Sequence, residues 1–303
     1  MGAFFRWVIE PGFFSSSPVR VALLLGGLIA AISSVVGVFT VLRGQSFGGH
    51  ALTDVSTAGG SGALLIGMAP VAGFVVGGVV GAGVMEAIGV RRPRGRDLAT
   101  GIVLGAATGL AALFLYLDST TSATTGASQQ ILFGSIFVVA SSTIPYVIFF
   151  GAVTLGLICL LYRPLLLSSL SDDIARARGV PVRVVGALYM LALALSVGLS
   201  SLVTGTILST ALLIGPPAAA LRVTRRMNRA IAVAVLVGVG ATWLGVLLSY
   251  DSYYWGTSQN GWPVSFFIVA VVFVAYLASG LPARWDGRKT ERVTQARVEG
   301  QAR

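Results

Sequence analysis

The sequence has few charged residues for its length. Only 11% of the 303 residues are Asp, Glu, Lys or Arg, whereas a soluble globular domain has about 25%. Hydrophobic residues make up 55% of the chain, and the mean hydropathy is +0.87. The scarcity of charge excludes an ordinary water-exposed surface, and the apolar content excludes a disordered chain. The composition therefore predicts an integral membrane protein.

Cysteine and lysine each occur once, and each scarcity excludes a class of site. The lone Cys159 lies in an apolar run, so no disulfide can form within the chain and no cysteine-based metal site can be built. The only lysine is Lys289, and no glycine-rich loop ends in Gly-Lys-Ser/Thr. The chain therefore lacks a phosphate-binding loop of its own and is not expected to hydrolyse ATP.

Long apolar runs dominate the sequence and predict an all-α fold. A spanning helix needs about 20 mostly apolar residues. Such runs lie near residues 20–42, 48–68, 70–90, 98–117, 141–162, 183–201, 203–221, 230–250 and 263–281. We expect a polytopic transmembrane helical bundle of about eight to nine spans. Two adjoining pairs, 48–68 with 70–90 and 183–201 with 203–221, have so little linker that broken or re-entrant segments stay open, and Gln129–Val139 is too short to span.

Basic residues are unevenly distributed between the loops. Nineteen of the 21 Lys and Arg residues fall on one side of the predicted spans, and only Arg6 and Arg20 fall on the other. Because cytoplasmic loops are enriched in basic residues, this distribution predicts an outside N-terminus and a cytoplasmic C-terminus. The net charge of +10 is therefore a topology signal rather than evidence for nucleic-acid binding. We expect residues 1–19 to form an interfacial segment, 20–281 the transmembrane domain and 282–303 a cytoplasmic tail.

Small residues and prolines mark how the spans pack. Glycine recurs every fourth residue at Gly73, Gly77 and Gly81, and again at Gly101, Gly105 and Gly109. In lipid such stripes let helix backbones approach each other closely, so both are predicted packing seams. Pro216 and Pro217 interrupt a predicted span, which favours a kink there over a ligand site.

The single histidine, His50, lies in the second predicted span, and Asp54 follows one helical turn later on the same face. Measured from Arg43, Asp54 lies about 16 Å deeper, near the middle of the bilayer. An acid at that depth is costly and is therefore expected to have a function. The residues alone leave three interpretations open: a structural hydrogen bond, a proton relay, or a cation site in which imidazole and carboxylate bind Zn²⁺ or Mn²⁺.

A short amphiphilic helix is predicted between the fifth and sixth spans, near residues 170–181. Asp172 and Asp173 suit its N-terminus, and Gly179 with Pro181 ends it. Because it is held between two spans, such a helix could transmit a push from a cytoplasmic partner.

Four segments resemble the zinc/manganese/iron ABC transporter permeases. Residues 41–54 (VLRGQSFGGHALTD) with Gly59 resemble the second-span motif of that family, and 172–181 (DDIARARGVP) resemble its coupling helix. Residues 203–220 (VTGTILSTALLIGPPAAA) and 96–103 (RDLATGIV) are also similar. The resemblance extends from about residue 20 to 281. In the family Asp usually precedes His by four residues, whereas here His50 comes first, and Ala58 replaces a proline.

The resemblance implies the permease subunit of a bacterial importer for a divalent metal, multi-pass in the cell (inner) membrane. Its implied metal ligands are His50 and Asp54, with zinc or manganese as the transported ion and no permanently bound cofactor. It also implies a homodimer, separate cytoplasmic ATPase subunits and an extracytoplasmic metal-binding protein. The implied ATPase contacts are Asp172, Asp173, Ala175 and Gly179. Two alternatives remain: a secondary transporter of a small molecule with the proton on Asp54, and a membrane assembly subunit without transport.

Overall fold

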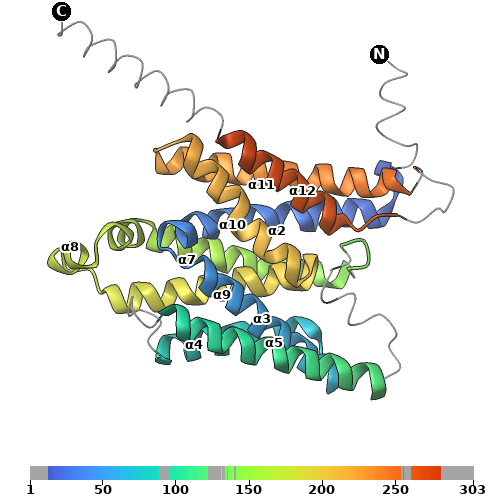
Figure 1. Cartoon of the computed structure of the whole chain (residues 1–303), viewed down its shortest axis with the longest axis horizontal. Coiled ribbons are helices and arrows are strands. Elements are labelled where there is room, and N and C mark those ends of the chain that lie inside the picture. Colours follow the sequence, from blue (N-terminus) through green and yellow to red (C-terminus); the bar gives the residue numbers. More distant parts are fainter. Residues whose placement is uncertain are drawn as a thin grey trace, which may run out of the picture.

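The computed structural model describes residues 13–88, 96–121, 131, 134, 136–139, 141–253, 255 and 261–280. These residues form helices joined by short turns, with no β-strand among them. Most of the helices run roughly alongside one another, with α4 and α5 at one edge of the bundle and α11 and α12 at the other (Figure 1). The predicted all-α transmembrane bundle is confirmed.

The long helices follow the predicted spans closely. They are α2 (Ser17–Leu42), α3 (Ser46–Leu65), α4 (Pro70–Ile88), α5 (Arg96–Thr121), α7 (Ile144–Leu170), α9 (Val182–Thr204), α10 (Thr206–Val223), α11 (Met227–Ser252) and α12 (Val264–Ser279). Shorter elements are η1 (Phe13–Ser15), η2 (Ser141–Thr143) and α8 (Asp172–Ala177). The clearest difference is at α7, which continues eight residues beyond the predicted end at 162. Residues 1–12 of the predicted interfacial segment and the tail from 281 lie outside the described residues.

Seven of these helices are long and apolar enough to cross a membrane by length and composition: α2, α4, α5, α7, α9, α10 and α11. The apolar α12 is shorter, with 16 residues. Although α3 has 20 residues, its many polar side chains keep it below the hydropathy of the other seven. Because α3 packs against α4, α5, α9 and α10, other helices of the bundle surround it.

The two tight linkers are turns between continuous helices rather than breaks within a span. Residues 66–69 join α3 to α4, with Gly67 at φ +72°. Gly205 alone separates α9 from α10, at φ +84°. This left-handed region is readily available only to glycine, so a single residue is enough to end one helix and start the next.

The first glycine stripe is the seam between α3 and α4, as predicted. Gly73 and Gly77 lie against Gly59 of α3, so closely that a Cβ on either would overlap the Gly59 backbone. Gly78 and Gly198 leave room in the same way for the buried Ser56 side chain. Close backbone approach of this kind replaces the hydrophobic driving force that is absent in lipid.

The proline pair of α10 meets a glycine of α2. Pro217 has no N–H for the Leu213 carbonyl four residues earlier, so that carbonyl receives no helical hydrogen bond. The Leu213 oxygen instead lies against Gly37, so that a Cβ at Gly37 would overlap it and would lie 2.8 Å from the Pro217 ring. The predicted Pro216–Pro217 interruption is therefore a packing feature in which glycine accommodates a freed carbonyl.

We predict that Gly37→Ala destabilises the protein by about 1–3 kcal/mol, because the new methyl group must displace backbone as well as a proline ring. The matched control is Gly156→Ala in α7, where a Cβ would meet nothing within 4 Å. This control should unfold at or slightly above the wild-type temperature, because alanine favours helix over glycine. Thermal unfolding of the detergent-purified protein measures both, and equal midpoints for the two variants would contradict the assignment.

Candidate functional site

The two predicted ligands lie one turn apart on α3, but each has its own partner helix. His50 is half-buried, and its Nδ1 lies 2.9 Å from the Thr210 hydroxyl of α10. Asp54 is 9% exposed, and its Oδ2 accepts a 2.6 Å hydrogen bond from the Thr108 hydroxyl of α5. The pair therefore sits where α3 meets both α5 and α10.

These hydrogen bonds leave a defined set of atoms for a ligand. In the tautomer in which Nδ1–H donates to Thr210, the lone pair of His50 is on Nε2. Asp54 retains Oδ1 as an acceptor that the Thr108 bond does not use. Partners of this kind orient metal-binding side chains and fix the imidazole tautomer. The arrangement suits binding of a divalent cation, and it equally permits a proton on Asp54.

One chain does not supply a complete metal site in its described part. No group of three or more His, Cys, Asp or Glu side chains is close enough there to hold an ion. A zinc or manganese ion takes about four to six ligands, so His50 and Asp54 would supply at most part of the coordination shell. An ion bound there would need further ligands beyond these two side chains, for example from water or from another copy of the chain.

The second glycine stripe borders this site but contacts little of the described chain. A Cβ at Gly105 or Gly109 would meet nothing within 4 Å, and one at Gly101 would meet only the Phe47 ring, at 4.0 Å. Thr108, which bonds to Asp54, is an exposed residue on the same helix. The described part of α5 packs almost entirely on α3. Unlike the stripe of α4, the predicted seam of α5 is thus open within the chain.

Sequence reasoning did not identify Thr108 or Thr210. They lie 54 and 160 residues from the side chains they contact. Threonine is common in membrane helices, where its hydroxyl bonds to the preceding turn. The Thr108 hydroxyl shares its one proton between the Leu104 carbonyl and the Asp54 carboxylate. Neither residue had a local signal that set it apart.

The predicted amphiphilic helix is α8, at one end of the bundle (Figure 1). The Ser171 side chain caps it by accepting from the Ile174 N–H, and Gly179 ends it at φ +77°. Asp172, Asp173 and Gly179 are exposed, whereas Ala175 is completely buried. Of the four predicted contact residues, three therefore face outward, and Ala175 anchors the helix to the bundle.

Hydrogen bonds connect several basic helix ends at the α8 end of the bundle. Arg43 after α2 bonds to Ser168 near the end of α7. Tyr162 of α7 bonds to Asn228 at the start of α11, and Arg222 of α10 bonds to Tyr276 of α12. The arginines of these segments thus gather at one end, as their positions in the sequence predict.

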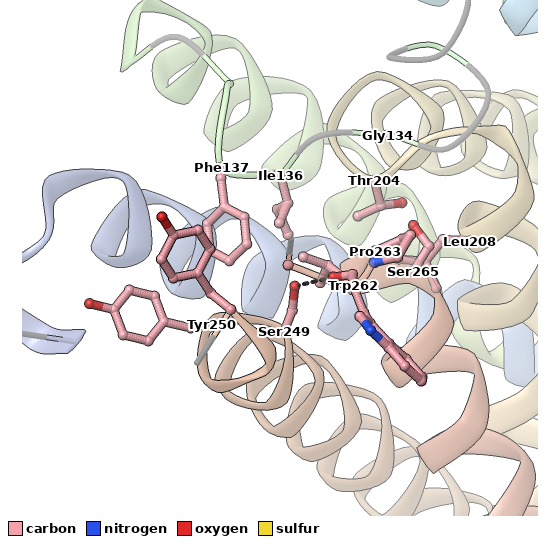
Figure 2. A pocket seen from close by; sticks show the side chains of 13 residues that line it. Gly134, Ile136, Phe137, Thr204, Leu208, Ser249, Tyr250, Trp262, Pro263 and Ser265 are labelled. Carbon is pink, nitrogen blue, oxygen red and sulfur yellow. Dashed lines mark hydrogen bonds between the residues drawn. The ribbon is translucent and has the colours of Figure 1, made fainter. Parts of the chain in front are cut away.

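A pocket of about 390 Å³ lies at the other end, between the ends of α9, α10, α11 and α12. Figure 2 shows aromatic rings at its wall and the hydrogen bond from the Ser249 hydroxyl to the Trp262 carbonyl, 2.7 Å long. None of the described residues that line it is His, Cys, Asp or Glu. It is therefore separate from the His50–Asp54 site, and its described lining offers no strong ligand for a divalent cation.

Comparison with protein families matches residues 16–280 to the ABC 3 transport family. Among curated proteins, the manganese transport system membrane protein MntC of Halalkalibacterium halodurans is 32% identical over 240 residues, which cover 78% of this chain and 81% of MntC. The chelated iron transport system membrane protein YfeD of Yersinia pestis is 27% identical and is covered over 82% of both chains.

Two solved structures have the same fold. PsaBC from Streptococcus pneumoniae in complex with Fab superposes with a TM-score of 0.75 at 25% identity, over 92% of this chain and 95% of that chain. An inward-facing metal-chelate type ABC transporter gives a TM-score of 0.69 at 17% identity, over 87% of this chain and 84% of that one. At the lower identity the likeness concerns the fold alone.

Proposed function

The chain belongs to the ABC 3 transport family, and from that premise we propose that it is the membrane-spanning permease of an importer for a divalent metal ion. Relatives named for manganese and for iron transport favour those two metals, and zinc remains the third candidate. The observation that supports this function best is the His50–Asp54 pair, held inside a membrane bundle by Thr210 and Thr108. Two metal-ligating side chains one turn apart, next to an open helix face, suit a transported ion better than a structural hydrogen bond.

A second copy of the chain would supply the ligands that one copy lacks. Packing α5 against its twin would bury Gly105, Gly109 and Thr108 and would bring two His50–Asp54 pairs toward a common axis. Two histidines and two carboxylates are enough for a complete coordination shell. A homodimer through α5 therefore accounts for both the open glycine face and the incomplete site.

In this proposal the end of the bundle that holds α8 and the arginines faces the cytoplasm. There α8 would contact a separate ATP-hydrolysing subunit through Asp172, Asp173 and Gly179, which are exposed. An extracytoplasmic binding protein would deliver the ion at the opposite end, where the termini of α9 and α10 meet. ATP-driven rocking of the two copies would then expose the His50–Asp54 site to the cytoplasm.

The first test is removal of the proposed ligands. His50→Ala and Asp54→Ala should each lower cellular accumulation of manganese or iron at least about tenfold, since even residues that only support metal ligands contribute that much to affinity. Ser61→Ala is the control, because Ser61 lies on the same helix and bonds only to its own preceding turn. Co-purification with the ATPase subunit should be unchanged in all three variants. Normal accumulation in both ligand variants would refute the role of the pair.

The second test concerns the dimer face. Gly105→Leu should convert the purified dimer to monomer, because a leucine in a close glycine seam holds the two backbones apart. Gly156→Leu is the matched control, since Gly156 is also an exposed helix glycine with nothing within 4 Å. The mass of the detergent-solubilised protein, measured by light scattering, decides the question. A stable Gly105→Leu dimer would place the interface elsewhere.

The third test separates an ABC permease from a proton-coupled secondary transporter, the alternative function. Gly179→Glu should abolish the coupling of ATP hydrolysis to metal uptake in a permease, whereas a carrier has no need of α8. Gly179→Asn is the control, because asparagine tolerates the φ of +77° found here better than glutamate does. Metal uptake and ATP hydrolysis are measured in proteoliposomes that hold the whole complex. Uptake by Gly179→Glu at the level of the asparagine control would favour the carrier.

A further inference from the structure

A partly buried arginine connects three helices beside α8. Arg43 directly follows α2, and its Nη1 donates a 2.8 Å hydrogen bond to the Ser168 hydroxyl in the last turn of α7. Its guanidinium also lies over the ring of Tyr189 of α9, with 5.3 Å between Cζ and the ring centroid. Cation–π contacts of this kind are attractive and gain strength away from water.

Tyr189 of α9 in turn contacts α2 through Thr40. It is completely buried, and its hydroxyl lies 2.7 Å from the Thr40 hydroxyl. Because Thr40 donates its own proton to the Val36 carbonyl, the Tyr189 O–H is the donor in this bond. Thr40, Arg43, Ser168 and Tyr189 thus form one connected polar cluster, here named the Arg43 junction.

The junction lies between the two helices that hold α8. Ser168 precedes the α8 cap residue Ser171 by three positions, and α9 begins at Val182, just after α8. A pocket of about 310 Å³ adjoins the junction, lined by the α2–α3 turn, by the corner from Ser168 to Asp172 and by the first residues of α9. Space beside the junction leaves the corner that leads into α8 room to shift.

The junction also adjoins the turn that leads into α3. Between Arg43 and Ser46 the chain turns through Gly44 at φ +60°, and the Gln45 N–H bonds back to the Thr40 carbonyl at 2.9 Å. His50 follows Arg43 by seven residues and Asp54 by eleven, all but the turn being helical. A shift of Arg43 therefore moves the start of the helix that holds the candidate metal ligands.

From this geometry we propose that Arg43 is a positioning residue that transmits displacement of α8 to the His50–Asp54 helix. The inference rests on the proposed function and adds a route for the coupling. When the ATPase pushes α8, the end of α7 moves, and Arg43 moves with it because it is bonded to Ser168 and stacked on Tyr189. Side chains that only stabilise the bundle would support folding without affecting how much ion is moved per ATP.

The test measures metal imported per ATP hydrolysed by the reconstituted full complex, with Mn²⁺ as the probe. Arg43→Met keeps the aliphatic length but loses the charge and the hydrogen bond. It should lower the Mn²⁺-to-ATP ratio at least about fivefold, the smaller end of typical coupling energies between sites. Its ATPase rate and the Mn²⁺ affinity of the permease should remain near wild type. Arg229→Met is the control, because Arg229 is an exposed arginine in the first turn of α11, away from the junction.

Two milder variants keep the proposal testable if Arg43→Met fails to assemble. Ser168→Ala and Tyr189→Phe each remove one hydrogen bond of the junction and should lower the ratio about two- to tenfold. Wild-type ratios in Arg43→Met, or in both milder variants where Arg43→Met does not assemble, would overturn the proposal. ATP-dependent Mn²⁺ uptake by the unmutated complex is measured alongside, and its absence would refute the proposed function rather than the role of Arg43.

Discussion

The structure depends on keeping one polar helix away from lipid. Within α3, Thr53, Thr57 and Ser61 bond to carbonyls of their own helix, while His50 and Asp54 need partners from elsewhere. A polar helix exposed to hydrocarbon would leave such groups unsatisfied at a cost of several kcal/mol. Surrounding α3 with α4, α5, α9 and α10 solves this problem. The same enclosure brings Thr108 and Thr210 within bonding distance of Asp54 and His50.

The helices α4 and α5 cover α3 in different ways. On the α4 side, glycines let the backbones of α3 and α4 lie in direct contact, so these two helices are closely packed. On the α5 side the helix shields α3 with its inner face, while its outer face presents exposed glycines. A stripe of small residues adds little stability when it faces lipid tails, because it stabilises a protein by allowing close contact with another helix. In our proposal, the pairing of two chains therefore does two things at once: it completes the metal site and it covers the exposed face of α5.

The two ends of the bundle differ in chemistry. At the α8 end, hydrogen bonds from Arg43, Tyr162 and Arg222 join helices that are distant in sequence. At the other end, aromatic side chains surround a pocket without strong metal ligands among its described residues. In our proposal these polar contacts lie at the end where the ATPase subunit would bind, and α3 begins at that end.

Much of this protein was predictable from the sequence, because the membrane imposes strong local rules. Length and hydropathy predicted the spans, and the glycine repeat of α4 predicted a packing seam, although not that its partner is α3. Asp172 and Asp173 at one end, with Gly179 and Pro181 at the other, predicted α8. His50 and Asp54 stood out because polar groups at membrane depth are costly. Their partners were not predictable, since a hydrogen bond between helices depends on which faces meet. Which faces meet was decided only when the helices packed, and the same is true of the open face of α5 and of the contact between Arg43 and Ser168. The side chains in these contacts are 54 to 160 residues apart, so they interact through space and leave no local pattern in the sequence.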